Sequence, residues 1–425
     1  MQLKRKSPLS VRGQLTLATC GLLAGTTAQA ADTLDTSWKL DSALLYYTEK
    51  DRVHVTEPTV HMKKALADDE FLTVRVVLDS MSGASPNGAT ITDKPQTFTS
   101  PSGNSVDTIA AGKFPTRSFT DTRYAIGADW EKSLGRMTRN ILTGNLSTET
   151  DYASVGVSDT ITRDFNNRLT TFSAGLGANY DTVNPVGGTP VALSVVPAPP
   201  GAIVSTGSSN NKTNVDALVG ITQILTPRML TQLNFTHSNE NGYLTDPYKL
   251  LSVVDPVTGG TLSYVFEKRP ATRSSNAIYW SLAYHLPHDV VHFSYRYFSD
   301  DWGIKAHTAE LRYRFELGSG GNYLEPHLRY YSQSAADFYR HSLVNGQPLP
   351  QYASADYRLA EMQGNTIGLK FGVPTGKAGE WGVRVERMVE TGNGHPADAI
   401  GVQQNYDLYP KLEVTTLLIS YSIRF

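Results

Sequence analysis

Apolar and polar side chains alternate along many segments of this 425-residue chain. Within 304–317, for example, Leu311, Tyr313 and Phe315 occupy alternate positions, and charged residues occupy the positions between them. Because successive side chains of a β-strand point to opposite faces, such a segment has one apolar and one polar face. We find no convincing run of helical periodicity. The pattern therefore predicts an all-β protein.

Sixteen segments fit this alternation, and an even count is typical of single-chain bacterial outer-membrane barrels. They are 37–49, 52–64, 71–81, 118–132, 138–149, 153–163, 169–181, 213–224, 229–242, 275–286, 290–300, 304–317, 323–333, 363–374, 380–390 and 412–425.

The connections between these segments are of two kinds. Seven are short and hold turn-forming residues: 66–70, 134–137, 164–168, 225–228, 287–289, 318–322 and 375–379. The alternate ones are mostly long, namely 82–117, 182–212, 243–274, 334–362 and 391–411. Short periplasmic turns and long extracellular loops are typical of outer-membrane barrels, whereas sandwiches and propellers do not sort their loops in this way. We therefore predict a single transmembrane antiparallel up-and-down β-barrel of about 16 strands.

The amino-terminus predicts export. A cationic stretch that includes Lys4–Lys6 precedes a short apolar run at 15–25, and Ala28-Gln29-Ala30 follows as a cleavage site. This pattern predicts a signal peptide at 1–30 and a barrel at 31–425, located in the outer membrane of a Gram-negative bacterium. A lipoprotein signal ending at Cys20 is the alternative, although Thr19 is atypical before such a cysteine.

The carboxy-terminus resembles the closing strand of Gram-negative outer-membrane barrels. Leu417, Ile419, Tyr421, Ile423 and Phe425 alternate with other residues, and the chain stops on the aromatic Phe425. In those barrels the last strand is bound by the barrel-assembly machinery. The resemblance implies that Tyr421 and Phe425 form an assembly signal, with that machinery as a partner. Outer-membrane lipid and lipopolysaccharide are further expected partners.

Composition excludes several classes of function. The formal net charge of −2 gives no case for nucleic-acid binding. Cys20, the only cysteine, leaves with the predicted signal peptide, so the mature chain has no disulfide, thiolate metal site or cysteine nucleophile. No stretch reaches 18 consecutive apolar residues, which excludes a transmembrane helix.

Catalytic and metal-binding patterns are weak. His285, His288 and His292 span a predicted tight turn that directs the rings to different faces, so we expect no metal site. Serine and histidine are scattered over many strands, and the chain has no Gly-rich phosphate loop, haem attachment or calcium loop. The sequence therefore predicts no enzyme and no cofactor.

The inward face of the predicted barrel is asymmetric. Strands between 138 and 286 direct mostly small or neutral polar groups inward, whereas those at either end of the chain direct charges inward. The candidate lumen residues are Arg75, Asp79, Asp121, Arg123, Asp129, Glu131, Arg296, Glu310, Arg312, Arg314, Glu316, Glu325, His327, Arg329, Lys370, Arg384 and Glu386. Because the last strand would pair with the first, these charges should form one arc of the wall. Ion pairs that brace the wall explain most single residues, and the arc as a whole favours a path for small charged or dipolar solutes.

Several segments resemble the Gram-negative envelope family named domain of unknown function 3570. They are 83–89, 121–131, 295–303, 307–313 and 323–339, which run through nearly the whole mature chain. The family has no assigned biochemical role. Its genes often lie near genes for a small lipoprotein, a thioredoxin-like protein and a flavin-attaching enzyme, which implies a possible periplasmic lipoprotein or redox partner by association only.

The loop 82–117 begins with a motif of the same family. Gly83, Ser85, Pro86, Asn87 and Gly88 combine small residues with a turn-forming proline and two positions that tolerate a positive φ. Such a backbone can fold back into a lumen as a constriction, and an ordinary surface turn is the alternative.

Three functions remain open at this point. A channel for small solutes is the first hypothesis, because a barrel of 16 strands is wide enough for an aqueous path. A plugged or sheath-like barrel that holds a periplasmic or surface partner is the second. An outer-membrane enzyme ranks last.

Overall fold

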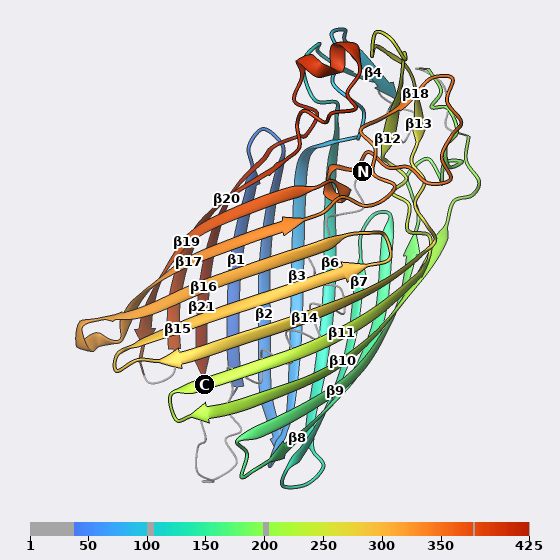
Figure 1. The fold of residues 1–425 in the computed structure, drawn as a ribbon. Helices are drawn as coiled ribbons and strands as arrows, with labels where there is room; N and C mark the ends of the chain where they lie inside the picture. The colour runs from blue at the N-terminus through green and yellow to red at the C-terminus, as the bar shows by residue number, and fades with distance from the viewer. Residues whose placement is uncertain (1–37, 100–105, 199–203, 377–378, 425) are drawn as a thin grey trace.

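The computed structural model describes residues 38–99, 106–198, 204–376 and 379–424. The predicted signal peptide at 1–30 and Phe425 lie outside these ranges. Sixteen antiparallel strands close into one barrel (Figure 1). They are β1 (Trp38–Glu49), β2 (Val53–Ala67), β3 (Glu70–Pro86), β6 (Thr116–Ser133), β7 (Thr138–Thr148), β8 (Tyr152–Phe165), β9 (Thr170–Val183), β10 (Asn210–Thr226), β11 (Met229–Gly242), β14 (Thr272–His285), β15 (Asp289–Asp300), β16 (Lys305–Leu317), β17 (Asn322–Gln333), β19 (Met362–Thr375), β20 (Gly379–Gly392) and β21 (Leu412–Arg424).

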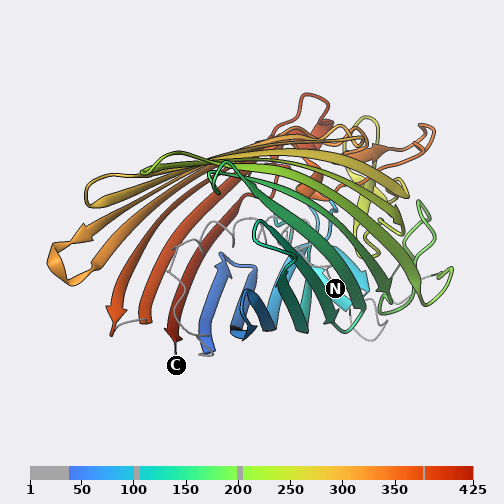
Figure 2. The same cartoon turned by 90° about the horizontal axis from the view of Figure 1, so that it is seen from below.

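The predicted strands and their closure are confirmed. β1 pairs with β21 from Lys39 opposite Arg424 to Glu49 opposite Val414, so the wall has no free edge. In Figure 2, seen from below, the blue to teal strands form one side of the wall, the yellow and orange strands lie across from them, and the red β21 lies next to the blue β1. Several boundaries were off by two or three residues, and that of the third strand was wrong by five. Residues 82–86 do not belong to a loop, because β3 continues its pairing with β6 as far as Pro86 opposite Thr116.

The outer face of the barrel is apolar. Large exposed hydrophobic residues occupy alternate positions on most strands, as on β9 with Leu176 and on β19 with Ile367. Aromatic pairs lie near the short-turn end, where the rings of Trp381 and Tyr421 are 4.6 Å apart. An apolar band with aromatic residues at its border is the lipid-facing surface of an outer-membrane barrel.

The long connections form a cap at the other end of the barrel (Figure 1). We use the name cap for the described residues of 87–115, 184–209, 243–271, 334–361 and 393–411. The cap contains five short strands and two short 3-10 helices, which the sequence analysis did not predict. They are β4 (Gln96–Thr99), β5 (Val106–Ile109), β12 (Leu250–Val254), β13 (Thr261–Phe266), β18 (Ser342–Val344), η2 (Tyr357–Leu359) and η3 (Gly401–Asn405). A third 3-10 helix, η1 (Gly318–Gly320), lies in a short turn, and within the described ranges no helix is long and apolar enough to cross a membrane.

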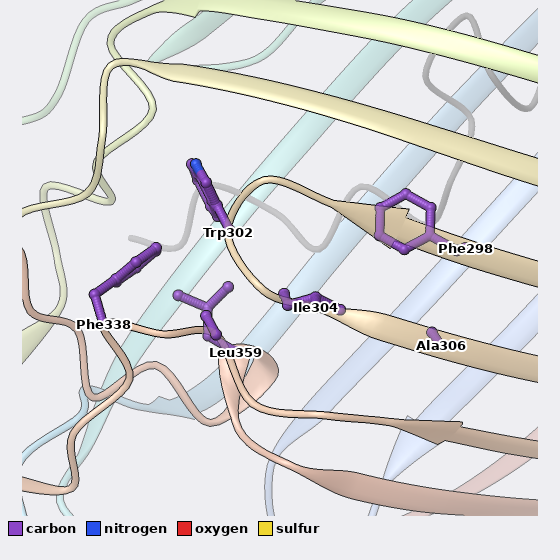
Figure 3. Packing of buried hydrophobic residues seen from close by; sticks show 7 residues of the cluster. Phe298, Trp302, Ile304, Ala306, Phe338 and Leu359 are labelled. Carbon is purple, nitrogen blue, oxygen red and sulfur yellow. The ribbon is translucent and has the colours of Figure 1, made fainter.

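The buried apolar cores lie in the cap and at the outer strand ends. In Figure 3, Trp302 of the β15–β16 turn lies beside Phe338 and Leu359 of the cap. The rings of Trp302 and Phe338 meet edge to face, with their centroids 5.1 Å apart. The barrel directs most of its large apolar side chains to lipid, so the outer end is where apolar clusters are removed from contact with both water and lipid.

Candidate functional site

The first group of lumen charges lies on β2, β3, β6 and β7. Arg75 donates to Asp129 at 2.9 Å, and Thr143 donates to the same carboxylate oxygen at 2.8 Å. Arg123 forms a close ion pair with Asp79. These contacts cross neighbouring strands of one wall, so the charges brace the sheet as opposite partners do across a β-ladder.

In the same group, near the short turn between β6 and β7, two cations contact one carboxylate. The ammonium of Lys63 lies 3.1 Å from Glu131, and the guanidinium of Arg139 lies 3.4 Å from it. The alternation along the sequence indicated Glu131 but neither cation. Lys63 belongs to a segment whose alternation is weak, since Val60 and Met62 are followed by two lysines.

The second group lies on β16, β17, β19 and β20. His327 is buried between two carboxylates, at 2.8 Å from Glu386 and 3.3 Å from Glu310. Arg312 forms a close ion pair with Glu310, and Arg384 donates to Glu325 at 2.9 Å. Acidic and basic groups therefore alternate across four adjacent strands.

Nearer the short turns, two cations contact the same aromatic side chain, that of Tyr323. The guanidinium of Arg314 lies 3.6 Å from the centre of the Tyr323 ring, and Lys370 contacts the hydroxyl of the same tyrosine. That hydroxyl donates to Glu380 at 2.6 Å. Cation–π stacking fixes the direction of Arg314 and leaves its charge near the lumen surface.

Other predicted residues differ in their surroundings. Arg329 lies opposite Glu310 in the β16–β17 ladder, and its side chain is exposed. Arg296 lines a small pocket on the lumen side with Asn234, Thr236 and Phe298. Glu316 is exposed next to the short turn that follows β16.

The neutral half of the wall is less neutral than the sequence analysis predicted. Asp181 of β9 and Asp216 of β10 are buried at inward positions, and Lys212 lies 3.6 Å from Asp181. In the charged half, Glu57 of β2 also faces inward and lies close to Asp79, and the sequence pattern did not indicate it. These residues fall at strand ends or in a strand with weak alternation, where the pattern indicates the face poorly.

The cap encloses a buried cluster of charges, which we call the cap charge cluster. Its members are Asp246, Lys249, Glu267, Arg269, Asp356 and Arg358. Arg269 lies 2.6 Å from Glu267 and 2.8 Å from Asp356, and Arg358 lies 3.0 Å from Asp246. Three cations thus face three carboxylates, and the cluster ties the loop 243–271 to the loop 334–361.

The family motif at 83–88 is held by hydrogen bonds from residues in and next to this cluster. Lys249 donates to the carbonyl of Pro86, and the backbone N–H of Leu250 donates to the carbonyl of Asn87 at 2.8 Å. Ser85 and Asn87 are both buried. Gly88 has a φ of 96°, and a Cβ at this position would lie 2.4 Å from the carbonyl oxygen of Leu250. The motif therefore anchors the loop 243–271 of the cap to the rim of the barrel.

The cap reaches distant parts of the rim. Tyr248 donates to Asp151 in the β7–β8 turn at 2.9 Å. Trp302 in the β15–β16 turn packs against Phe338, and Tyr409 packs in one core with Met362 at the start of β19. In the strand order these anchors lie well apart around the wall, so the cap spans the outer mouth.

Three carboxylates meet near one of these anchors. Asp121, Glu149 and Asp151 each place an oxygen within 4.8 Å of the others. Oxygen ligands of this kind suit a hard divalent cation. Thr150 and Tyr248 already donate to two of the three groups. None of the histidines considered in the sequence analysis belongs to the group, and the predicted lack of a metal site stays a prediction.

The pH should affect this anchor through Asp151. Burial raises the pKa of Asp151 to about 6, Tyr248 opposes the shift by donating a hydrogen bond, and the charge of Asp121 adds to it. The pKa of an aspartate in an unfolded chain is about 4. The protonated carboxyl thus supports the fold fully below about pH 4, and this support is lost as the pH rises through about 6.

We expect Asp151→Asn to remove this dependence. The thermal midpoint of the wild type should fall relative to that of the variant between pH 4 and 7. Asp68→Asn, at an exposed position in a short turn, serves as the control and should follow the wild type. Parallel curves for wild type and Asp151→Asn would contradict the assignment.

The solved structures that are similar to this chain include outer-membrane proteins. A bacterial polysaccharide outer membrane secretin has a TM-score of 0.45 and 9% identity, with 93% of this chain and 100% of that chain covered. OccK3 (OpdO) of Pseudomonas aeruginosa has a TM-score of 0.43 and 11% identity, with 92% and 96% covered. The CymD monoaromatic hydrocarbon channel has a TM-score of 0.41 and 7% identity, with 92% and 89% covered.

No curated protein matches this chain. A family model does match, over residues 12–423, and its description is "Protein of unknown function (DUF3570)". That range covers nearly every strand of the barrel and the whole cap. The chain therefore belongs to the family of unknown function DUF3570.

Proposed function

We propose that this protein is an outer-membrane channel for small charged solutes, with a mouth that the cap covers on the extracellular side. The observation that carries the proposal is the charged wall of β16, β17, β19 and β20. Its carboxylates are held by neighbouring basic groups, as Glu310 is by Arg312 and His327. Arg329 of the same wall is exposed to the lumen.

Such a wall suits selection by charge. A cation that is held by the wall but exposed to water attracts an anion and repels a cation over several ångströms. Two unit charges about 8 Å apart in water interact by about 0.5 kcal/mol before screening by salt. Interactions of that size bias passage without trapping the solute, as a channel requires.

The plugged barrel is the second candidate, and the cap favours it. Buried apolar cores and a buried charge cluster across the mouth would resist the passage of solutes. In that case the barrel would present the cap to a surface partner or its short turns to a periplasmic lipoprotein or redox protein. In either case lipid and lipopolysaccharide would surround the wall, and the barrel-assembly machinery would insert it.

Conductance in a planar lipid bilayer tests the proposal. The folded wild-type barrel should give steady, ion-selective steps. Arg329→Glu should raise the permeability for cations relative to anions by about two- to five-fold, because it reverses a charge beside the path. Arg228→Glu makes the same change in an exposed short turn between β10 and β11 and should have a smaller effect.

Two outcomes would contradict a channel with this wall. Wild-type steps with selectivity that Arg329→Glu leaves unchanged would remove Arg329 from the path. Inserted, heat-modifiable protein that stays silent, even when the cap has been loosened by substitution, would leave the plugged barrel as the better hypothesis.

A further inference from the structure

A carboxylate lies on the lipid-facing side of the barrel, half-way along β8. Asp159 is exposed, and its neighbours on the outward face of the same strand are Val157 and Ile161. On the adjacent strands it lies opposite Leu142 of β7 and Leu176 of β9. The nearest residues along its strand and directly opposite it are thus apolar and face lipid.

The position of Asp159 lies deep in the apolar band. Its partner Leu176 lies midway on β9 between the exposed Phe172 and the exposed Tyr180. The ring of Phe172 packs against Phe165 at the short-turn end of β8. Polar groups near the middle of a bilayer are costly, and they usually find a partner or line a path for solutes. The lumen cannot be that path here, because Asp159 points away from it.

One neighbour of Asp159 is also polar. The side-chain amide of Asn140 on β7 donates to Oδ1 of Asp159. An asparagine amide has two N–H donors and a carbonyl acceptor, and a carboxylate has a second oxygen. One hydrogen bond between the two side chains therefore leaves a donor and acceptors that hydrocarbon cannot satisfy.

The surface around this pair allows close approach. Gly144, Ala174 and Ala178 are exposed outward on β7 and β9, and a Cβ at Gly144 would meet nothing within 4 Å. Across the barrel the lipid face carries large side chains, such as Trp280 on β14 and Tyr330 on β17. Small residues let the backbones of two membrane segments approach, and polar residues then bind across the contact.

We propose that the outward face of β7, β8 and β9 binds a second copy of this chain, with Asp159 and Asn140 at the centre of the contact. The reason for a second copy is self-complementarity. A two-fold axis along the membrane normal keeps both residues at the same depth, so Asn140 of each copy can donate to Asp159 of the other. The contact is isologous, and it rests on the barrel fold and not on the channel function.

Cysteine cross-linking in the native membrane tests this contact. Cys20 is the only cysteine and lies in the predicted signal peptide, so single cysteines can be introduced at Leu142, Gly144, Ala174 and Leu176 in turn. At least one of them should give a disulfide-linked dimer on mild oxidation. Ile278→Cys is the matched control on β14, because Ile278 is exposed to lipid to a similar extent as Leu142, and it should stay monomeric.

Removal of the polar pair gives an independent readout. Asp159→Leu in the cross-linking background should lower the dimer yield at least five-fold while the heat-modifiable barrel remains folded. Three outcomes would overturn the proposal. They are monomers at all four positions, an equal dimer yield from Ile278→Cys, and cross-links only to a chain of different mass, which would assign the face to another protein.

Discussion

Arg358→Ala should release the cap from the mouth of the barrel. Arg358 contacts Asp356 through two nitrogens and lies 3.0 Å from Asp246, and both carboxylates are buried. Breaking a buried ion pair by removing one partner costs about 3–5 kcal/mol, because a charge remains without compensation. A loss of about 3–5 kcal/mol of stabilisation should separate the loop 334–361 from the loop 243–271 and raise single-channel conductance.

The titration of Asp356 supports this expectation. Burial acts to raise the pKa of Asp356, but the charges of Arg358, Lys249 and Arg269, with the hydrogen bond from Arg358, together outweigh it and hold the pKa well below its usual value. A depressed pKa means that the stabilisation is present above the pKa of the unfolded chain and is lost as the pH falls through the folded value. At neutral pH the full contribution is present in the wild type and reduced in Arg358→Ala, in which only Lys249 and Arg269 still stabilise the carboxylate.

Limited proteolysis and conductance measure the release together. Chymotrypsin, whose aromatic cleavage sites neither substitution removes, should cut the cap of Arg358→Ala at least ten-fold faster than that of the wild type, while the barrel keeps its heat-modifiable mobility. Arg340→Ala is the control, since Arg340 lies in the same loop but is exposed. Wild-type cleavage rates in Arg358→Ala would show that the cap charge cluster does not hold the loops.

Gly88→Ala should loosen the same cap through steric conflict. Gly88 has a φ of 96°, and an added Cβ would lie 2.4 Å from the carbonyl oxygen of Leu250. A left-handed backbone costs a residue with a Cβ about 1–2 kcal/mol, and the contact with a backbone atom adds to that cost. We expect faster cleavage of the cap and higher conductance, as for Arg358→Ala.

Gly346→Ala separates the two contributions. Gly346 also has a positive φ, 83°, but a Cβ there would meet nothing within 4 Å. This variant should therefore show the backbone cost alone and a clearly smaller loosening. Equal changes in cap cleavage and conductance at Gly88 and Gly346 would mean that the contact with Leu250 contributes nothing. The motif would then not anchor the cap.

The sequence by itself determined the barrel. Alternation is a local property of each strand, and a lipid-facing wall requires it on one face, so segments such as 304–317 identify themselves without their neighbours. The even number of strands and the sorting of turns and loops then settled the architecture. Inward positions such as Arg75, Arg312 and Glu386 followed from the same period of two.

Only the tertiary structure decided which of these groups meet. Asp129 lies beside Arg75 on the next strand, and His327 contacts Glu386 across β19, because the pairing registers align them and no single strand contains that register. The cap is the extreme case, since Lys249 contacts the carbonyl of Pro86, 163 positions away. Loops have no period to indicate a face, and their contacts depend on how the barrel brings their ends together. The cap charge cluster and the exposed Asp159 pair therefore became visible only in three dimensions.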